Sequence, residues 1–167
     1  MNNVFVNGKL VRFRNAVIDV AVENLRDTLA LVPNEHLLRI SLIEVVPPQN
    51  FGHGPNYAGG GSGLGYPRLS ELCFSRRHRE SNFPINLTLL HEIGHILDHH
   101  FDCLENLTGV HRATLEAIPI PSSARTHGDG EQFAIAYQQV ITGGASEEIR
   151  AAVLASRAFV GVDLVRR

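Results

Sequence analysis

Apolar residues recur along this chain with two different periods, and each period predicts a different kind of element. A spacing of three to four residues predicts helices over residues 15–31, 87–101, 129–142 and 146–160. Alternation and β-branched residues predict strands within residues 4–13, with a turn at Asn7-Gly8, and over residues 37–46 and 69–76. We therefore expect an α+β fold in one domain over residues 1–167, with a small mixed sheet followed by a helical part.

Several local signals set the expected boundaries of these elements. Asn15 is a suitable N-cap for the first helix, and Ser81 or Asn82 for the helix over residues 87–101, with Pro84 in its first turn. Ser146 is a suitable N-cap for the last helix. The connection after Phe101 shows little structure beyond a helical turn near Glu105.

A glycine-rich stretch separates the second and third predicted strands. Residues 50–67 contain a run of glycines, but no Lys-Ser or Lys-Thr follows, so a phosphate-binding loop is not expected. We expect a loop at the rim of a cleft, in which His53 and Tyr57 are exposed to solvent.

The helix predicted over residues 87–101 carries an H-E-x-x-H motif at residues 91–95. His91 and His95 are four residues apart, so they lie one turn apart on a helix and both imidazoles can reach a single ion. Glu92 leaves the helix about 100° round from His91, where it can act on a metal-activated water without binding the ion itself. This arrangement is typical of metal-assisted peptide hydrolysis.

The rest of this helix distinguishes the motif from a chance occurrence. Thr88 and Asp98 share the arc of the two histidines, and Asp98 is placed to accept a hydrogen bond from a ligand histidine or a nearby backbone group. Gly94 costs roughly 1 kcal/mol in a helix interior, so we expect a close backbone approach there. The opposite arc is apolar: Ile85, Leu89, Leu90, Ile93, Ile96 and Leu97. We therefore expect a zinc site rather than a structural pair of histidines.

A catalytic zinc site needs a third protein ligand. The metzincin pattern does not apply, because Asp98 and Phe101 occupy its glycine and third-histidine positions. Glu131 is the best candidate because it lies in the first turn of a helix whose opposite face is apolar enough to pack on a core. The full set of candidates is Glu105, His111, His127, Asp129 and Glu131, and the apolar face is Phe133, Ala136, Tyr137 and Val140.

The sequence HEIGHILD followed downstream by EQFAIAY resembles the gluzincin metallopeptidases. More narrowly it is similar to the catalytic domain of anthrax lethal factor and its relatives, in which the second segment reads E-F-F-A-E-A-F. The resemblance is confined to these two segments. It implies a zincin-like fold, with His91, His95 and Glu131 as Zn²⁺ ligands and Glu92 as the general base.

Two positions depart from that family's pattern. Ala124 stands where the family has a tyrosine that stabilises the oxyanion, and Ile135 stands where the family has an acid after the ligand. His127 is the nearest substitute for the missing tyrosine and is our candidate catalytic residue beside Glu92; Tyr57 and Tyr66 are weaker candidates.

Three functions are compatible with these residues. The leading hypothesis is a zinc endopeptidase acting on a peptide or protein, which the strand over residues 69–76 would bind at a sheet edge. The first alternative is a regulatory metalloprotein that cleaves a transcriptional repressor, although its glutamate usually follows the motif more closely. The second is a degenerate zincin that binds a peptide or protein without turnover.

The composition indicates which classes of binding partner and which cellular compartment to expect. The formal net charge is −2 with mixed signs, so neither nucleic acid nor an acidic surface is expected as a main partner. Cys73 and Cys103 do not make a disulfide framework, and we expect both to be reduced and partly buried. No stretch reads as a signal peptide or a membrane span. We expect a cytoplasmic protein by default, while export without a cleaved signal is also compatible with the sequence.

Overall fold

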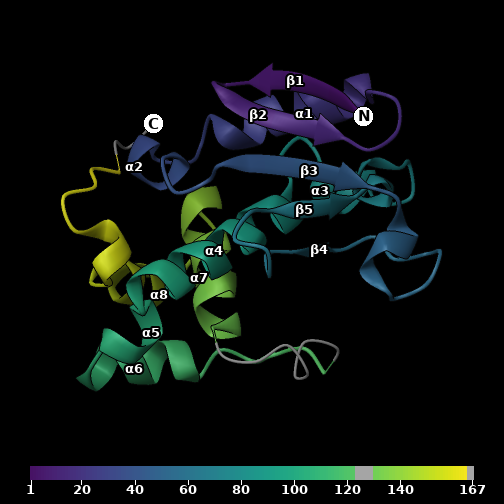
Figure 1. Ribbon diagram of the computed structural model, residues 1–167. Coiled ribbons are helices and arrows are strands. Elements are labelled where there is room, and N and C mark those ends of the chain that lie inside the picture. The colour runs from purple at the N-terminus through teal and green to yellow at the C-terminus, as the bar shows by residue number, and fades with distance from the viewer. Residues whose placement is uncertain (123–129, 165–167) are drawn as a thin grey trace. The chain divides into compact units, whose positions relative to one another are not determined.

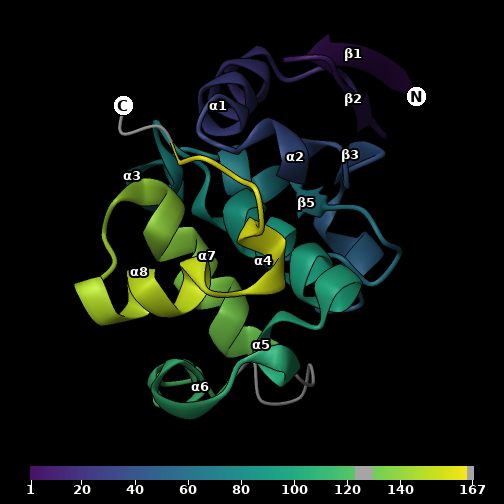
Figure 2. The same ribbon diagram turned by 90° about the vertical axis from the view of Figure 1, so that its left-hand side faces the viewer.

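The computed structural model describes residues 1–122 and 130–164, except for the side chains of residues 79 and 80 (Figures 1 and 2). The chain divides into two compact units, Met1–Ile93 and Gly94–Arg167, and the division falls within helix α4 (Leu87–Phe101). The fold is α+β, as expected.

The first unit contains a mixed five-stranded sheet in the order β1-β2-β3-β5-β4. Strands β1 (Asn2–Val6) and β2 (Lys9–Phe13) form the predicted hairpin, whose turn residues Asn7 and Gly8 have φ values of 47° and 75°. Both positive angles suit the type I′ turn that asparagine and glycine favour. Strands β3 (Leu42–Val46) and β5 (Arg68–Ser70) continue the sheet in parallel, and β4 (Gly60–Gly61) closes it in the antiparallel direction.

Helix α1 (Asp19–Leu29) lies against one face of the sheet (Figure 2). It begins later than predicted, so Ile18 rather than Asn15 occupies the cap position; the Asn15 side chain donates to Glu71 Oε1 at 2.7 Å. The short helix α2 (Asn34–Leu37) shortens the predicted strand over residues 37–46 at its start. Alternate residues of the strands pack with α1 into the core of this unit: Val6, Val11, Phe13, Ala21, Leu25, Leu29, Ile43, Val45 and Leu69.

The predicted strand over residues 69–76 is wrong in its length and in its place at the sheet edge. Strand β5 ends at Ser70, whose hydroxyl accepts from the Leu72 amide at 3.2 Å and begins a 3-10 turn, Glu71–Phe74. Strand β4, in the glycine-rich stretch, is the edge instead. A second 3-10 turn (Pro48–Phe51) precedes this stretch, and the short helix α3 (Arg79–Asn82) follows β5.

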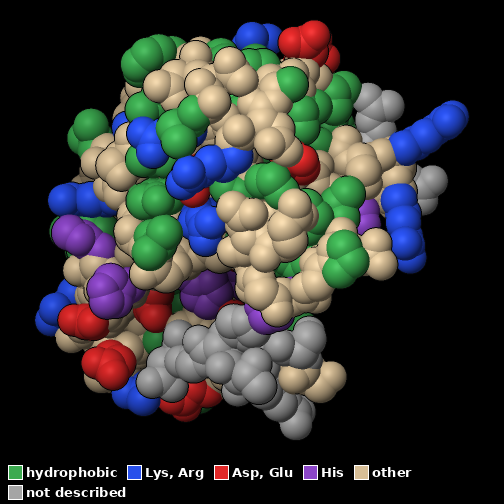
Figure 3. Space-filling model, turned by 45° about the vertical axis from the view of Figure 1, so that its right-hand side comes forward, with side chains coloured by type: hydrophobic (Ala, Val, Ile, Leu, Met, Phe, Trp, Pro, Cys, Tyr) green, Lys and Arg blue, Asp and Glu red, His purple; other side chains and the backbone are tan. Residues whose placement is uncertain are grey.

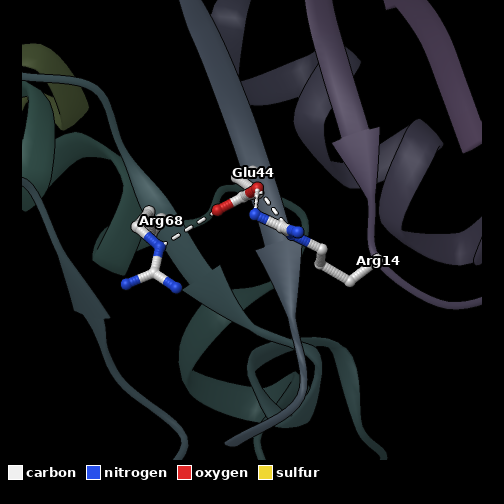
Figure 4. Close-up of polar contacts among 3 residues, drawn as sticks. All are labelled: Arg14, Glu44 and Arg68. Atoms are coloured by element: carbon white, nitrogen blue, oxygen red, sulfur yellow. Dashed lines mark hydrogen bonds and ion pairs between the residues drawn. The ribbon is translucent and has the colours of Figure 1, made fainter. Parts of the chain in front are cut away.

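The carboxylate of Glu44 in strand β3 is buried and bonds two arginines, Arg14 and Arg68 (Figure 4). Glu44 in β3 is 0% exposed, and it accepts from Arg14 Nε at 2.8 Å and from Arg68 Nε at 3.1 Å. A buried charge is tolerated only when it is paired and hydrogen-bonded, and two guanidinium groups meet that need here. Other Lys and Arg side chains are scattered among hydrophobic ones on the surface drawn in Figure 3.

The start of α4 is held by a buried network of asparagines. Asn86 is the capping residue: its Oδ1 accepts from the Leu89 amide at 2.9 Å. Its Nδ2 donates to Asn24 Oδ1 at 2.9 Å, and its backbone amide donates to Thr28 Oγ1 at 2.7 Å, which ties the helix start to α1. Every polar group in such a buried network has a partner, so the network fixes the position from which the motif residues project.

The prediction for this cap is wrong in part. Asn82 Oδ1 does accept from the Leu87 amide at 3.1 Å, but the residue that immediately precedes the helix is Asn86. Pro84 lies before the helix rather than in its first turn.

The second unit is helical. It contains the end of α4, α5 (Cys103–Asn106), α6 (Gly109–Glu116), α7 (Glu131–Thr142), α8 (Glu147–Leu154) and a 3-10 turn (Arg157–Phe159). Helix α6 was not predicted. Ser146 caps α8 as predicted, accepting from the Ile149 amide at 3.3 Å, and Gly143 ends α7 with φ of 77°. The core of this unit includes Leu97, Leu115, Phe133, Ala136, Tyr137, Ala152 and Val153.

Across the described residues, no helix combines the length and the apolar character needed to cross a membrane.

Candidate metal centre

Helix α4 presents the two motif histidines on a half-buried face. The opposite arc is buried as predicted within the helix: Leu89, Leu90, Ile93, Ile96 and Leu97 are each at most 9% exposed. Ile85, which the prediction also placed on this arc, lies before the helix and is half-buried. Burial of this apolar arc determines how the helix is rotated about its own axis. The rotation leaves His91 and His95 at the boundary between core and solvent, where an ion can reach them.

Glu131 meets the second histidine. It opens α7, its side chain is only 6% exposed, and its Oε1 lies 3.0 Å from His95 Nε2. His91 precedes His95 by one turn of the same continuous helix. One ligand atom from each of His91, His95 and Glu131 lies within 4.8 Å of the others, so this group could hold a metal ion. Two imidazoles and one carboxylate form a donor set that transition-metal ions can bind.

The start of α7 is fixed by contacts within the second unit. Gly130, with φ of 96°, precedes Glu131, and a Cβ atom at Gly130 would lie 2.5 Å from Asp98 Oδ2. Asp98 Oδ1 in turn accepts from the Leu104 amide at 2.9 Å, which is the bond to a nearby backbone group that the sequence predicted. Burial raises the pKa of Asp98, and the bond from Leu104 partly opposes this shift. The Asp98 side chain of α4 therefore packs directly against Gly130, the residue before Glu131.

The predicted close approach at Gly94 is present. A Cβ atom at this position would lie 2.7 Å from Ala134 Cα and 3.2 Å from Ala134 O. Gly94 thus lets α4 and α7 approach until their backbones touch, and only glycine fits. This contact brings the histidine helix within reach of a ligand from α7.

Glu92 lies on the part of α4 that belongs to the first unit, beside the sheet edge. It is 6% exposed, and a Cβ atom at Gly60 would lie 2.9 Å from its Cγ. The Tyr57 hydroxyl is nearby: burial raises the pKa of Tyr57, and the charge of Glu92 raises it further. Glu92 is therefore adjacent both to the candidate ligand His91 and to the edge strand β4.

Two buried thiols lie outside this chemistry. Cys73 and Cys103 are both free, as predicted, but they are fully rather than partly buried. Burial raises the pKa of each to about 12. A thiol with such a pKa is almost wholly protonated at neutral pH and is a poor nucleophile or metal ligand.

The structure does not bring all predicted site residues together. His127, Asp129 and Ala124 lie outside the described residues. Glu105 is exposed on α5, and neither it nor His111 belongs to the group of ligands.

Sequence reasoning missed part of the surroundings of Glu92. His53 is exposed as expected, but Tyr57 is half-buried against Gly59 and Gly60. The consecutive glycines at residues 59–61 were the available signal, because three residues without side chains permit close packing on both faces of a strand.

No family model, no curated protein and no solved structure matches this chain.

Proposed function

We propose that this protein is a zinc-dependent endopeptidase of the zincin type, with His91, His95 and Glu131 as metal ligands and Glu92 as general base. The observation that carries the proposal is the convergence of these three side chains, whose ligand atoms lie within 4.8 Å of one another. The buried acid next to His91 supports it, because a purely structural site would not need Glu92.

Each residue has a distinct task in this scheme. Zinc, when bound, polarises the scissile carbonyl and lowers the pKa of water to about 7. Glu92 takes the proton from the attacking water and delivers it to the leaving amine, as a general base and then a general acid. Glu131 and the two histidines hold their positions through the packing of α4 and α7 at Gly94 and Ala134.

The free edge of β4 supplies a binding site for an extended peptide. Strand addition at an exposed sheet edge satisfies main-chain groups on both partners and needs no particular side chain. Because Gly60 lies against Glu92, a peptide bound at this edge runs beside the proposed base.

The test is the variant Glu92→Gln. Glutamine keeps the shape and the hydrogen bonding but cannot accept the proton, so the variant should keep its zinc and lose peptide hydrolysis by roughly two to four orders of magnitude. The measurement is digestion of a mixed-peptide library, with metal content determined on the same samples. Glu147→Gln makes the same change at an exposed position of α8 and should cleave as the wild type does.

Other outcomes would redirect the assignment. Equal cleavage by Glu92→Gln and wild type would place the chemistry on other residues. Zinc binding without any cleavage by the wild type would favour a zincin that only binds peptides. Absence of metal after incubation with zinc would end the proposal.

A further inference from the structure

The free edge of the sheet at β4 has a defined hydrogen-bonding direction. The Ser70 amide donates to Gly59 O at 3.0 Å, so the next residue, Gly60, turns its own N–H and C=O away from β5. The Gly60 C=O already accepts from the Tyr57 hydroxyl at 2.9 Å, so a peptide at this edge would pair with the Gly60 N–H and with the second lone pair of the C=O. A Cβ atom on Gly60 would lie 2.9 Å from Glu92 Cγ and 3.0 Å from Thr88 Cγ2. One face of β4 is thus covered by helix α4.

The opposite face of β4 is covered by two aromatic rings. A Cβ atom at Gly59 would lie 2.5 Å from Tyr57 Cζ, and one at Gly61 would lie 3.6 Å from Phe51 Cε1. Gly59 and Gly61 point to the same face because side-chain directions alternate along a strand. The centroids of the Phe51 and Tyr57 rings are 5.0 Å apart, and we call these two rings the aromatic pair. The exposed imidazole of His53 borders the pair, with its centroid 4.7 Å from that of Tyr57.

The aromatic pair is held in place by polar contacts. The Tyr57 hydroxyl donates to Gly60 O at 2.9 Å, and the Tyr57 carbonyl accepts from Ser70 Oγ at 2.6 Å. The Arg68 guanidinium carbon lies 5.3 Å from the centroid of the Phe51 ring. Both rings are half-buried, so each retains surface that a ligand can contact.

We propose that the aromatic pair selects substrates: it takes a large apolar side chain of an extended peptide that pairs with the free edge of β4. This inference rests on the proposed function. A peptide added to β4 projects every second side chain onto the face shared by Gly59 and Gly61. Those glycines have no side chains, so the neighbours that such a residue meets are the rings of Phe51 and Tyr57.

The charges around the aromatic pair favour an apolar side chain over an acidic one. Arg68 is the cation that contacts Phe51, and its Nε is already bonded to Glu44 Oε2 at 3.1 Å. Glu92 is close enough for its charge to act on Tyr57, and the same charge would repel an acidic side chain of the peptide. An aromatic or leucine side chain gains contact area on the rings without disturbing the pair.

The test compares kcat/KM for two peptides that differ only in carrying phenylalanine or alanine at one position. The position is found first, by digesting a mixed-peptide library with the wild type and reading the residues that flank the cut. We expect large apolar residues at one of these positions, and a preference for phenylalanine over alanine of about tenfold. Phe51→Ala should remove most of that preference, whereas Phe51→Leu should keep most of it.

The control is Phe5→Ala, which makes the same change at a 74% exposed position in β1 and should leave the preference unchanged. Zinc content of every variant reports whether it is folded. If Phe51→Ala is unfolded, Phe51→Val, which keeps part of the apolar volume, takes its place and should show a clearly smaller preference than Phe51→Leu. A preference that is the same in all folded variants would overturn the inference.

Failure of this inference differs from failure of the proposed function. Cleavage without any preference for large apolar residues would leave the peptidase standing and overturn the role of the aromatic pair. If the wild type cleaves nothing, binding of the same two peptides is measured by fluorescence anisotropy. Tighter binding of the phenylalanine peptide, lost in Phe51→Ala, would support the aromatic pair in a protein that only binds, and equal binding would overturn it.

Discussion

At the scale of single residues, the candidate site depends on a carboxylate that reaches the histidines from a different helix. Glu131 is buried, and its Oε1 is 3.0 Å from His95 Nε2, so little movement is needed for both atoms to face a common ion. A ligand on a packed helix is already ordered before the metal arrives. The conformational entropy of the Glu131 side chain is therefore lost when the protein folds, and it does not reduce the affinity for the metal.

Replacing this ligand should weaken metal binding strongly. Loss of a group that merely orients a ligand costs about 10- to 100-fold in metal affinity, so Glu131→Ala, which removes a ligand oxygen, should cost more than about 100-fold. Zinc affinity measured by competition with a chromogenic chelator checks this. Glu147→Ala, on an exposed part of α8, serves as the control. Unchanged affinity in Glu131→Ala would remove this residue from the ligand set.

At the scale of elements, the decisive contact is between α4 and α7. The two helices meet at Gly94 and Ala134, with no room for a Cβ atom between Gly94 and the backbone of α7. Glycine in a helix interior is unfavourable by roughly 1 kcal/mol, which is the cost of allowing this approach. The elements of the site are therefore held together by packing as well as by any bound ion.

The variant Gly94→Ala separates helix propensity from packing. Alanine should stabilise the isolated helix by roughly 1 kcal/mol, but forcing a methyl group into a packed interface costs about 1–3 kcal/mol. We expect a net loss of about 1 kcal/mol in the free energy of unfolding, together with weaker zinc binding, measured by chemical denaturation and metal titration. At Gly144 a Cβ atom would meet only Thr142 Oγ1 at 3.9 Å, so Gly144→Ala should change stability by less than about 0.5 kcal/mol. A stabilised Gly94→Ala variant that binds zinc normally would contradict the close approach.

At the scale of the whole molecule, a bound metal ion would connect segments that are far apart in the sequence. The candidate ligands come from α4 and from α7, and helices α5 and α6 and the residues outside the described range lie between them in the chain. A ligand that binds only the folded protein adds its binding free energy to the free energy of unfolding. Metal binding and resistance to unfolding should therefore change together.

Zinc should raise the melting temperature of the protein. At a free zinc concentration 100 times the dissociation constant, the stabilisation is about 2.7 kcal/mol, which corresponds to an increase in Tm of roughly 5–10 °C for a chain of this size. Calorimetry with and without zinc measures the increase. Glu131→Ala should show much less of it, because one of its ligands is missing. An equal increase in that variant would mean that zinc binds elsewhere on the protein.

Local patterns were sufficient for several elements. The hairpin at Asn7-Gly8, the helix from Leu87 to Phe101 and the helix that Glu131 opens were all predicted, because each depends on turn chemistry or on periodicity within one short segment. The motif spacing and the apolar arc of α4 are likewise properties of one helix. The candidate ligands His91, His95 and Glu131 were named on those grounds, and they converge in the fold.

Two features of the fold, the cap of α4 and the edge strand of the sheet, depend on contacts between residues that are distant in the chain. Asn86 rather than Asn82 or Ser81 immediately precedes α4, because its partners Asn24 and Thr28 come from α1. The glycine-rich stretch forms the edge strand among the described residues, and it packs between α4 on one face and the rings of Phe51 and Tyr57 on the other. The sequence alone therefore determined which residues can form helices, a hairpin and a set of ligands. Only the packing of those elements determined which strand lies at the edge of the sheet beside Glu92, because edge position is a property of the assembled sheet and not of any one strand.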